Sequence, residues 1–239
     1  MARSSTAILV VDDEPQIRRL LKVSLAPQHF ELTEAGTAAA ALKRLATESF
    51  DLIILDLGLP DASGLTVIET VRKTSAVPII ILSVRGDEDS KVAAFDLGAD
   101  DYVTKPFGMG ELVARIRAAL RHRLQEQGAT PLLQCGEVSI DLVNREVKRG
   151  AATIKLSPTE YNLLRLLAEH QGKILTHQFI LKAIWGPAKI DDIQYLRVYI
   201  RALRQKLEDR VDQPEIIRTE TGVGYRLMCA ERAAGATAE

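Results

Sequence analysis

Residues 51–61 read DLIILDLGLPD, and this stretch decides the fold of the first half of the chain. Its four apolar residues, Leu52–Leu55, suit a short strand that is covered on both faces. The run ends abruptly in Asp56. The segment AILVVDDE at residues 7–14 repeats the pattern, because its apolar run ends in Asp12 and Asp13. Both segments predict buried strands with carboxylates at their carboxyl ends.

Strand-like and helical patterns alternate on either side of these two segments. Further strands are predicted at Phe30–Ala35, Val77–Leu82 and Tyr102–Val103. Helical periodicity lies between the strands, at Ile17–Leu25, Ala38–Leu45, Val67–Val71, Val92–Leu97 and Leu112–Leu120. Such alternation indicates βα units wound into a parallel sheet. We therefore predict an α/β domain over residues 1–124.

The second half has a different organisation. A polar stretch with Gly and Pro, QEQGATP at 125–131, is typical of a linker. Short strand patterns at Val138–Leu142 and Glu146–Lys148 come next, then helical patterns at Pro158–Glu169, Gln178–Trp185 and Asp192–Leu207, then a hairpin of Ile216–Glu220 and Tyr225–Met228 around glycines. We predict a second domain at 132–229 and a disordered tail at 230–239.

Composition narrows the class of protein. The 239 residues are 46% hydrophobic and 26% charged, which excludes a disordered, collagen-like or coiled-coil chain. No apolar run reaches the roughly 18 residues that cross a bilayer, and the first apolar run ends in acidic residues, unlike a secretory signal. Cys135 and Cys229 match no metal spacing and no disulfide framework. We expect small buried thiols in a soluble protein of a reducing compartment, the cytoplasm.

The net charge of -1 excludes a protein that binds nucleic acid over its whole surface. The first 124 residues carry 15 basic and 17 acidic side chains, and the remainder carries 16 and 15. Binding of DNA through one local basic surface stays open, with modest affinity for a single protomer.

Polar residues follow the predicted strands at the same end of the sheet. They are Asp12, Asp13, Asp56, Ser83 and Lys105. Ligands of open parallel sheets bind beyond these ends, and clustered carboxylates need a counter-charge such as Mg²⁺. Taken singly, each residue has an ordinary explanation, as a helix cap, a turn residue or a surface charge. The joint pattern favours a site.

The segments Val11–Glu14, Asp56–Gly64, Gly98–Tyr102 and Lys105–Phe107, with Ser83, together resemble the receiver domain of two-component response regulators. The resemblance implies a flavodoxin-like (βα)5 fold in which Asp56 accepts a phosphoryl group from a histidine of a sensor kinase. A carboxylate can act as such a nucleophile. The resemblance also implies that Mg²⁺ is held by Asp12, Asp13, Asp56 and the carbonyl of Gly58, that Ser83 and Lys105 bind the phosphoryl oxygens, and that the Lys105–Pro106 bond is cis.

Two further features follow from the same resemblance. Ser83 and Tyr102 would form a switch that responds to phosphate, although Tyr102 equally suits a ring that only covers the sheet edge. A charged face would form a symmetric receiver dimer on phosphorylation, through Lys91, Asp100, Asp101, Glu111 and Arg115, with Lys91–Glu111 and Asp101–Arg115 as the best pairs. The alternative for this face is ordinary solvated charge.

The helical pattern at Asp192–Leu207 has two unlike faces. Leu196, Ile200, Leu203 and Leu207 should face a core, and Gln194, Arg197, Arg201 and Arg204 form a basic stripe beside Tyr199. An exposed Arg stripe with aromatic residues suits a helix in a DNA major groove, and a solvated helix face is the alternative.

The order of elements, with Leu156–Tyr161, Leu203–Leu207 and Gly222–Arg226, resembles the winged-helix effector domain of the OmpR/PhoB family. The resemblance assigns Arg197, Tyr199 and Arg201 to base or backbone contacts, and Arg204, Arg218, Thr219 and Thr221 to phosphate and minor-groove contacts. The loop Gly186–Asp191 would touch RNA polymerase. Ala202 and Thr221 stand where the family often has Arg, so a base preference does not carry over.

Gly58 and the segments Ser75–Ile80, Lys105–Leu112 and Ile184–Pro187 resemble a subgroup of regulators that control potassium-uptake operons. We therefore expect a phosphorylation-activated transcription factor with a sensor kinase of that subgroup as partner, and no enzymatic activity beyond self-phosphotransfer and slow autodephosphorylation. Two alternatives remain. A Mg²⁺-dependent phosphotransferase with an Asp nucleophile would want a second Asp at position 58, which is Gly. A phosphorelay adaptor that binds protein would not need the Arg stripe.

Overall fold

The computed structural model describes residues 5–28, 30–84 and 88–229. The chain forms two compact units, Ser5–Arg123 and a second that starts at Leu124, and each is described by itself. The tail predicted to be disordered, 230–239, lies outside the described residues. No helix in the described ranges is long and apolar enough to cross a membrane.

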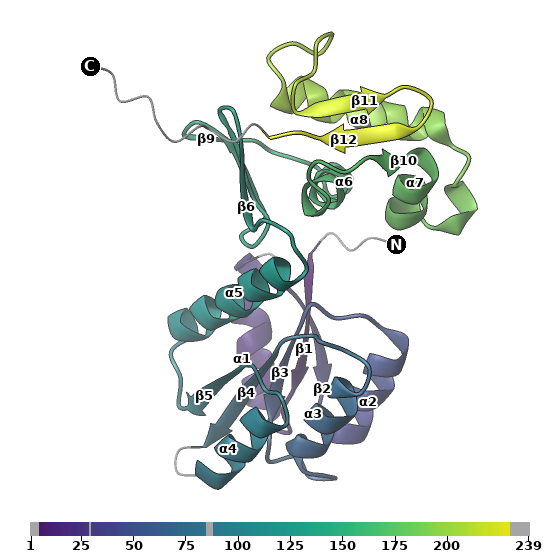
Figure 1. Cartoon of the computed structure of the whole chain (residues 1–239). Coiled ribbons are helices and arrows are strands. Elements are labelled where there is room, and N and C mark those ends of the chain that lie inside the picture. Colours follow the sequence, from purple (N-terminus) through teal and green to yellow (C-terminus); the bar gives the residue numbers. More distant parts are fainter. Residues whose placement is uncertain (1–4, 29, 85–87, 230–239) are drawn as a thin grey trace. The chain divides into compact units, whose positions relative to one another are not determined.

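The first unit is a five-stranded parallel sheet flanked by helices (Figure 1). Its elements are β1 (Thr6–Val11), α1 (Pro15–Leu25), β2 (Phe30–Ala35), α2 (Ala38–Thr47), β3 (Leu52–Asp56), α3 (Gly64–Arg72), β4 (Ile79–Val84), α4 (Glu88–Asp96), β5 (Asp101–Lys105) and α5 (Met109–Glu126), with a 3-10 turn at Ala26–Gln28. Every residue of β1 and β3 is buried, as the Val/Ile/Leu runs predicted. The predicted (βα)5 fold is confirmed.

The strand order β2-β1-β3-β4-β5 determines where a site can form. From β1 the chain crosses outward to β2, and it then returns past β1 to β3. The order therefore reverses between β1 and β3, and in such sheets ligands bind beyond the carboxyl ends at this reversal. The register pairs Val11 with Leu55, so the residues that follow these two strands lie side by side.

The second unit contains two antiparallel sheets and three helices. The first sheet is β6 (Leu132–Cys135), β7 (Val138–Asp141), β8 (Glu146–Arg149) and β9 (Ala152–Thr153), in that order. The helices are α6 (Pro158–Glu169), α7 (His177–Trp185) and α8 (Ile193–Leu207), with a 3-10 turn at Pro187–Lys189. The second sheet has the order β10 (Leu175–Thr176), β12 (Gly224–Leu227), β11 (Ile217–Glu220). The predicted winged-helix (α+β) organisation is confirmed.

Several short strands and one helix end differ from the sequence prediction. β6, β9 and β10 were not predicted, since they have two to four residues and an exposed residue in each. α5 runs to Glu126, into the stretch predicted as a linker. It is closed there by Gly128, whose φ of 73° suits glycine, and by the Ala129 N–H, which donates to the carbonyl of Leu124 at 2.8 Å.

The prediction that Cys135 and Cys229 are separate buried thiols is wrong. Cys135 at the end of β6 and Cys229 beyond the end of β12 form a disulfide, with Cα atoms 4.1 Å apart. The spacing of 94 positions gave no sign of this pair. The two sulfur atoms meet only because the fold brings the ends of two different sheets together, which is not visible in local sequence.

Candidate functional site

One ammonium group joins the carboxylates at the carboxyl edge of the parallel sheet. Lys105 Nζ, at the end of β5, lies 2.6 Å from Asp56 Oδ2 and 2.8 Å from Asp12 Oδ2. It also lies 3.2 Å from Glu14 Oε1. The predicted residues from three strands therefore meet, and the Lys105–Pro106 bond is cis. Glu14 was not among the predicted site residues, although it continues the acidic run after β1.

Burial controls the electrostatics of this cluster. The side chains of Asp12, Asp56 and Lys105 are 1%, 10% and 12% exposed. Burial raises the pKa of Asp12 above its ordinary value, against the hydrogen bonds that lower it. For Lys105, burial lowers the pKa, but the bonds to Asp12 and Asp56 outweigh it and raise the pKa above its ordinary value. Lys105 therefore stays charged.

The backbone after β3 holds the Asp56 carboxylate in place. Its Oδ1 accepts the Gly58 N–H at 3.0 Å, which leaves Oδ2 for Lys105. Gly64 allows the loop to return closely, because a Cβ there would lie 2.5 Å from the Asp56 carbonyl oxygen. Asp61 fixes the loop to α2, accepting the N–H groups of Ala38 and Ala39 at 2.8 and 2.9 Å. These backbone bonds lower the pKa of Asp61.

The acidic residues fit a hard divalent cation. Carboxylate oxygens of Asp12, Asp13 and Asp56 lie within 4.8 Å of one another. Asp13 is exposed and Asp12 is fully buried, so one ligand can come from the solvent side and one from the protein side. Oxygen-only donors at this spacing suit Mg²⁺, which usually keeps several waters. Gly58 is exposed next to Asp56.

The predicted switch residues lie on the two strands beyond Asp56. Ser83 is 6% exposed and pairs in register with Thr104 of β5. Tyr102 is 8% exposed, and Lys91 Nζ lies 5.1 Å from the centroid of its ring. The ring is therefore packed against the protein and carries a cation from α4. A switch between two ring positions stays a prediction.

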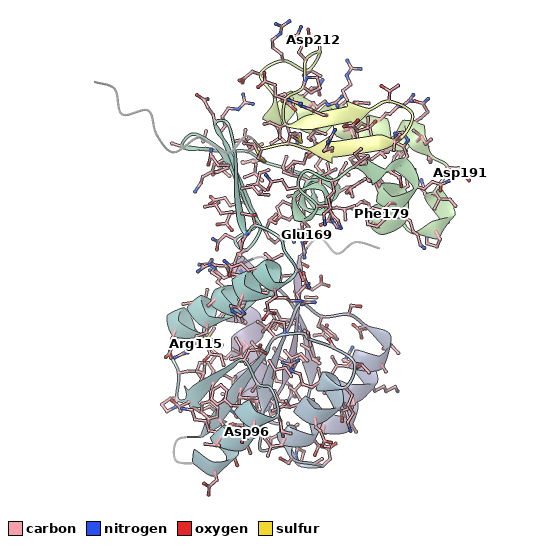
Figure 2. All side chains as sticks on the ribbon, in the orientation of Figure 1. Asp96, Arg115, Glu169, Phe179, Asp191 and Asp212 are labelled. Atoms are coloured by element: carbon pink, nitrogen blue, oxygen red, sulfur yellow. A yellow bond between two sulfur atoms is a disulfide. The ribbon has the colours of Figure 1, made fainter. Side chains whose placement is uncertain are left out.

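Most of the charged face predicted for dimerisation is paired within the chain. Arg115 lies on α5 (labelled in Figure 2). Its Nη1 lies 2.9 and 3.0 Å from the two oxygens of Asp101, and its Nη2 lies 2.9 Å from Glu111 Oε1. Asp100 has a different task, because it binds Arg72 at 2.8 Å and accepts the Ile79 N–H at 2.7 Å. Contacts between two chains stay a prediction.

The two predicted faces of α8 are present. Leu196, Ile200, Leu203 and Leu207 are buried, and Gln194, Arg197 and Arg201 are exposed. Tyr199 is half-buried and packs with Trp185 and Tyr195, with ring centroids 5.1 to 5.3 Å apart. On the wing, the hairpin of β11 and β12, Arg218, Thr219 and Thr221 are exposed. The exposed part of the basic stripe therefore starts near the N-terminus of α8.

Arg204 and Glu208 join α8 to the wing. Arg204 Nη2 donates to the Ile217 carbonyl and to Thr219 Oγ1, both at 2.7 Å, and burial lowers its pKa. The buried carboxylate of Glu208 accepts the N–H groups of residues 215, 216 and 217 at 2.8 to 3.1 Å. Sequence reasoning missed Glu208, since an acid at a helix C-terminus is unfavourable by itself and carries no sign of its distant partners.

Comparison with known proteins covers both units. Residues 8–117 match the family model of the response regulator receiver domain, and residues 151–227 match that of the transcriptional regulatory protein C terminus. The chain is 46% identical over 223 residues to the KDP operon transcriptional regulatory protein KdpE of Escherichia coli, covering 93% of this chain and 99% of that protein. It is 44% identical over 222 residues to the transcriptional regulatory protein KdpE of Mycobacterium tuberculosis, covering 92% and 98%.

A solved structure matches the first unit. The crystal structure of a CheY-like response regulator receiver domain protein from Methanospirillum hungatei aligns with a TM-score of 0.50 and 28% sequence identity. The alignment covers 51% of this chain and 98% of that one. The fold of the first unit, its clustered carboxylates and its sequence relatives therefore all indicate a receiver domain.

Proposed function

The chain belongs to the response regulators with an OmpR/PhoB-type effector domain, and we propose that it controls a potassium-uptake operon when Asp56 is phosphorylated. The operon follows from the KdpE relatives at 44% and 46% identity. The observation that carries the phosphorylation step is the contact of Lys105 Nζ with Asp56 Oδ2 at 2.6 Å, beside Asp12.

The proposed reaction transfers a phosphoryl group from a histidine of a sensor kinase. An oxygen of the Asp56 carboxylate attacks phosphorus, and the bond from phosphorus to the imidazole nitrogen breaks. Asp56 is preoriented by the Gly58 N–H, and the Lys105 ammonium neutralises charge on the transferring group. Because its pKa is raised, Lys105 does not lose its proton to the attacking group.

We further propose that Asp12, Asp13 and Asp56, with the Gly58 carbonyl, hold Mg²⁺. The bound ion supplies positive charge to the phosphoryl oxygens and helps to orient them. The proposed catalysis has two parts, self-phosphotransfer to Asp56 and slow hydrolysis of the resulting acyl phosphate at the same residues.

We propose that phosphorylation acts on transcription through the second unit. Receivers at 1–124 pair through the face of Lys91, Asp101, Glu111 and Arg115, and the effector domains at 132–229, joined through the linker 125–131, bind promoter DNA. Two linked half-site contacts raise the affinity of domains that bind weakly alone. The exposed Arg197 and Arg201 support groove contact, and RNA polymerase would meet the Gly186–Asp191 loop. The partners are a KdpD-like sensor histidine kinase, promoter DNA and RNA polymerase, in the cytoplasm.

Acetyl phosphate tests the phosphoacceptor directly. The wild-type chain should gain one phosphoryl group in the presence of Mg²⁺, detected by intact mass, and Asp56→Asn should gain none. Asp96→Asn, on the exposed surface of α4, is the matched control and should react like the wild type (Figure 2). Equal labelling of Asp56→Asn and the wild type refutes the assignment.

DNA binding needs its own test. The phosphorylated chain should protect a site upstream of a potassium-transport operon in a footprint, and Arg201→Ala should weaken this protection. Arg19→Ala, an exposed residue of α1, is the control for loss of one positive charge. Protection that is unaffected by Arg201→Ala would contradict the proposed face of α8.

A further inference from the structure

A disulfide joins the two sheets of the effector unit. Cys135 closes β6, and Cys229 lies two residues beyond the end of β12. The sequence has only these two cysteines. Disulfides are rare in compartments where proteins regulate transcription, and those found there are usually transient or redox-sensing. A permanent structural bond is therefore the less suitable explanation for this pair.

The disulfide is anchored at the base of the wing. Met228, the neighbour of Cys229, donates its N–H to the Ile216 carbonyl at 2.8 Å, and Leu227 pairs with Ile217 in the β11–β12 ladder. The N–H groups of Ile216 and Ile217 are bound by Glu208 at the end of α8. The same strand ends are thus held by α8 through hydrogen bonds and by β6 through a covalent bond.

This position lies close to the wing residues that are proposed to bind DNA. Arg218 and Thr219 directly follow Ile217 in β11, and both are exposed. Arg218 and Thr219 are therefore only one and two positions from the base of the wing, and a change in the mobility of that base should affect them.

The sulfur atoms border a space that a small thiol can enter. A cavity of about 350 Å³ is lined by both cysteines and by Leu207, Glu208, Ile216 and Arg218, among others. Cys135 is 2% exposed, and Cys229 is half-buried. Exchange requires that a thiolate reach one sulfur in line with the bond, and Cys229 is the more exposed of the two residues.

We propose that Cys135 and Cys229 form a reversible redox site that controls the DNA affinity of the wing, with glutathione and its disulfide as the exchanging couple. For reduction, a glutathione thiolate attacks Cys229 Sγ, and Cys135 leaves as a thiolate that takes up a proton. A second glutathione thiolate attacks the glutathione sulfur of the mixed disulfide, and Cys229 leaves in the same way. The protein gains two electrons and two protons, and one glutathione disulfide forms. Oxidation is the reverse.

This inference rests on the proposed function only where it concerns DNA. The oxidised form holds the wing base from two sides and should bind DNA more tightly, because less freedom is lost on binding. Ordering of one or two side chains corresponds to a roughly three- to tenfold difference in affinity.

Thiol trapping tests the redox site without DNA. The native full-length chain is equilibrated in buffers that range from mostly reduced to mostly oxidised glutathione, then alkylated and weighed. We expect a two-electron transition within this range, and no protein disulfide in Cys135→Ser. A pair that stays oxidised in millimolar reduced glutathione, or one that stays reduced in glutathione disulfide, overturns the proposal.

A measurement of DNA affinity tests whether the redox state of the cysteine pair controls DNA binding. A fluorescent duplex of random sequence is titrated with the oxidised and the reduced wild type at one salt concentration, and the doubly substituted Cys135→Ser, Cys229→Ser chain is the redox-insensitive control. Equal affinities of the two wild-type forms overturn control of the wing. Failure of both forms to bind DNA overturns the proposed function instead, and it leaves the result of the thiol trapping unchanged.

Discussion

Removal of the Lys105 charge should destabilise the receiver unit strongly. In Lys105→Met, the carboxylates of Asp12 and Asp56, which are 1% and 10% exposed, lose the cation that contacts both of them. Removal of one partner from a buried ion pair typically costs 3–5 kcal/mol. Because Asp56 retains some contact with water, we expect the lower end, about 3 kcal/mol, or over a hundredfold in the unfolding equilibrium.

A second substitution should return most of this loss. Asp12→Asn removes one of the two uncompensated charges, and burial already raises the pKa of Asp12 against its charged form. We expect Asp12→Asn to restore about 2 kcal/mol in the Lys105→Met chain, because residues in one ion-pair network are strongly coupled. Mg²⁺ at a hundredfold excess over its dissociation constant should stabilise Lys105→Met by about 2.7 kcal/mol. It should stabilise the wild type less, because Lys105 already neutralises the same carboxylates there.

Two probes separate the units in the same full-length sample. Hydrogen exchange of peptides from β1 and β3 follows the receiver unit in increasing urea. Trp185 is the only tryptophan in the sequence, and its fluorescence follows the effector unit. The loss of stability in Lys105→Met should appear in the hydrogen exchange of β1 and β3 and not in the fluorescence of Trp185. Stability of Lys105→Met within about 0.5 kcal/mol of the wild type, the range of ordinary surface substitutions, would refute the claim that Lys105 balances this site.

Three further predictions concern other charged groups. Glu208→Gln should destabilise the effector unit by about 1–3 kcal/mol, seen in Trp185 fluorescence during urea unfolding, because a neutral amide accepts three backbone N–H groups less well. Burial raises the pKa of Glu160, but its bonds with Lys206 and Ser157 lower it overall, so its stabilisation is present above its unfolded pKa and is lost as the pH falls through its folded pKa. In the same fluorescence measurement, the stability of Glu160→Gln should decrease less steeply with falling pH than that of the wild type. Asp101→Asn should weaken the phosphorylated dimer in sedimentation and should leave phosphorylation by acetyl phosphate unchanged.

The sequence was sufficient for features that depend on local pattern. Apolar runs such as Leu52–Leu55 suit strands that are buried on both faces, as in the middle of a parallel sheet, and the acid that follows each run then lies at the edge of that sheet. The opposite faces of α8 follow from helical periodicity in the same way. The meeting of Asp12 and Asp56 therefore needed no knowledge of tertiary contacts beyond strand order.

Features that depend on distant partners were beyond the sequence. The sequence predicted Asp100 to lie in an interface between two chains, yet it forms an ion pair with Arg72 of its own chain, 28 positions away. Arg204 belongs to the basic stripe by periodicity, but the Ile217 carbonyl draws its guanidinium toward the wing. From the sequence alone, a charged side chain has many possible ion-pair and hydrogen-bond partners of similar energy. Only the fold determines which of them lies within reach.

The charge balance at the sheet edge explains why a divalent cation should be required for phosphorylation. The ammonium of Lys105 contacts three carboxylates, those of Asp12, Glu14 and Asp56, and the carboxylate of Asp13 lies beside those of Asp12 and Asp56. Conversion of Asp56 to an acyl phosphate adds negative charge, so Lys105 must release a carboxylate when it turns to the phosphoryl oxygens. If the released carboxylate is that of Asp12, which is 1% exposed, it would be left buried without a counter-charge, at a cost of several kcal/mol. A cation that binds Asp12 and Asp13 removes this cost, and the need for it follows from the contacts of Lys105.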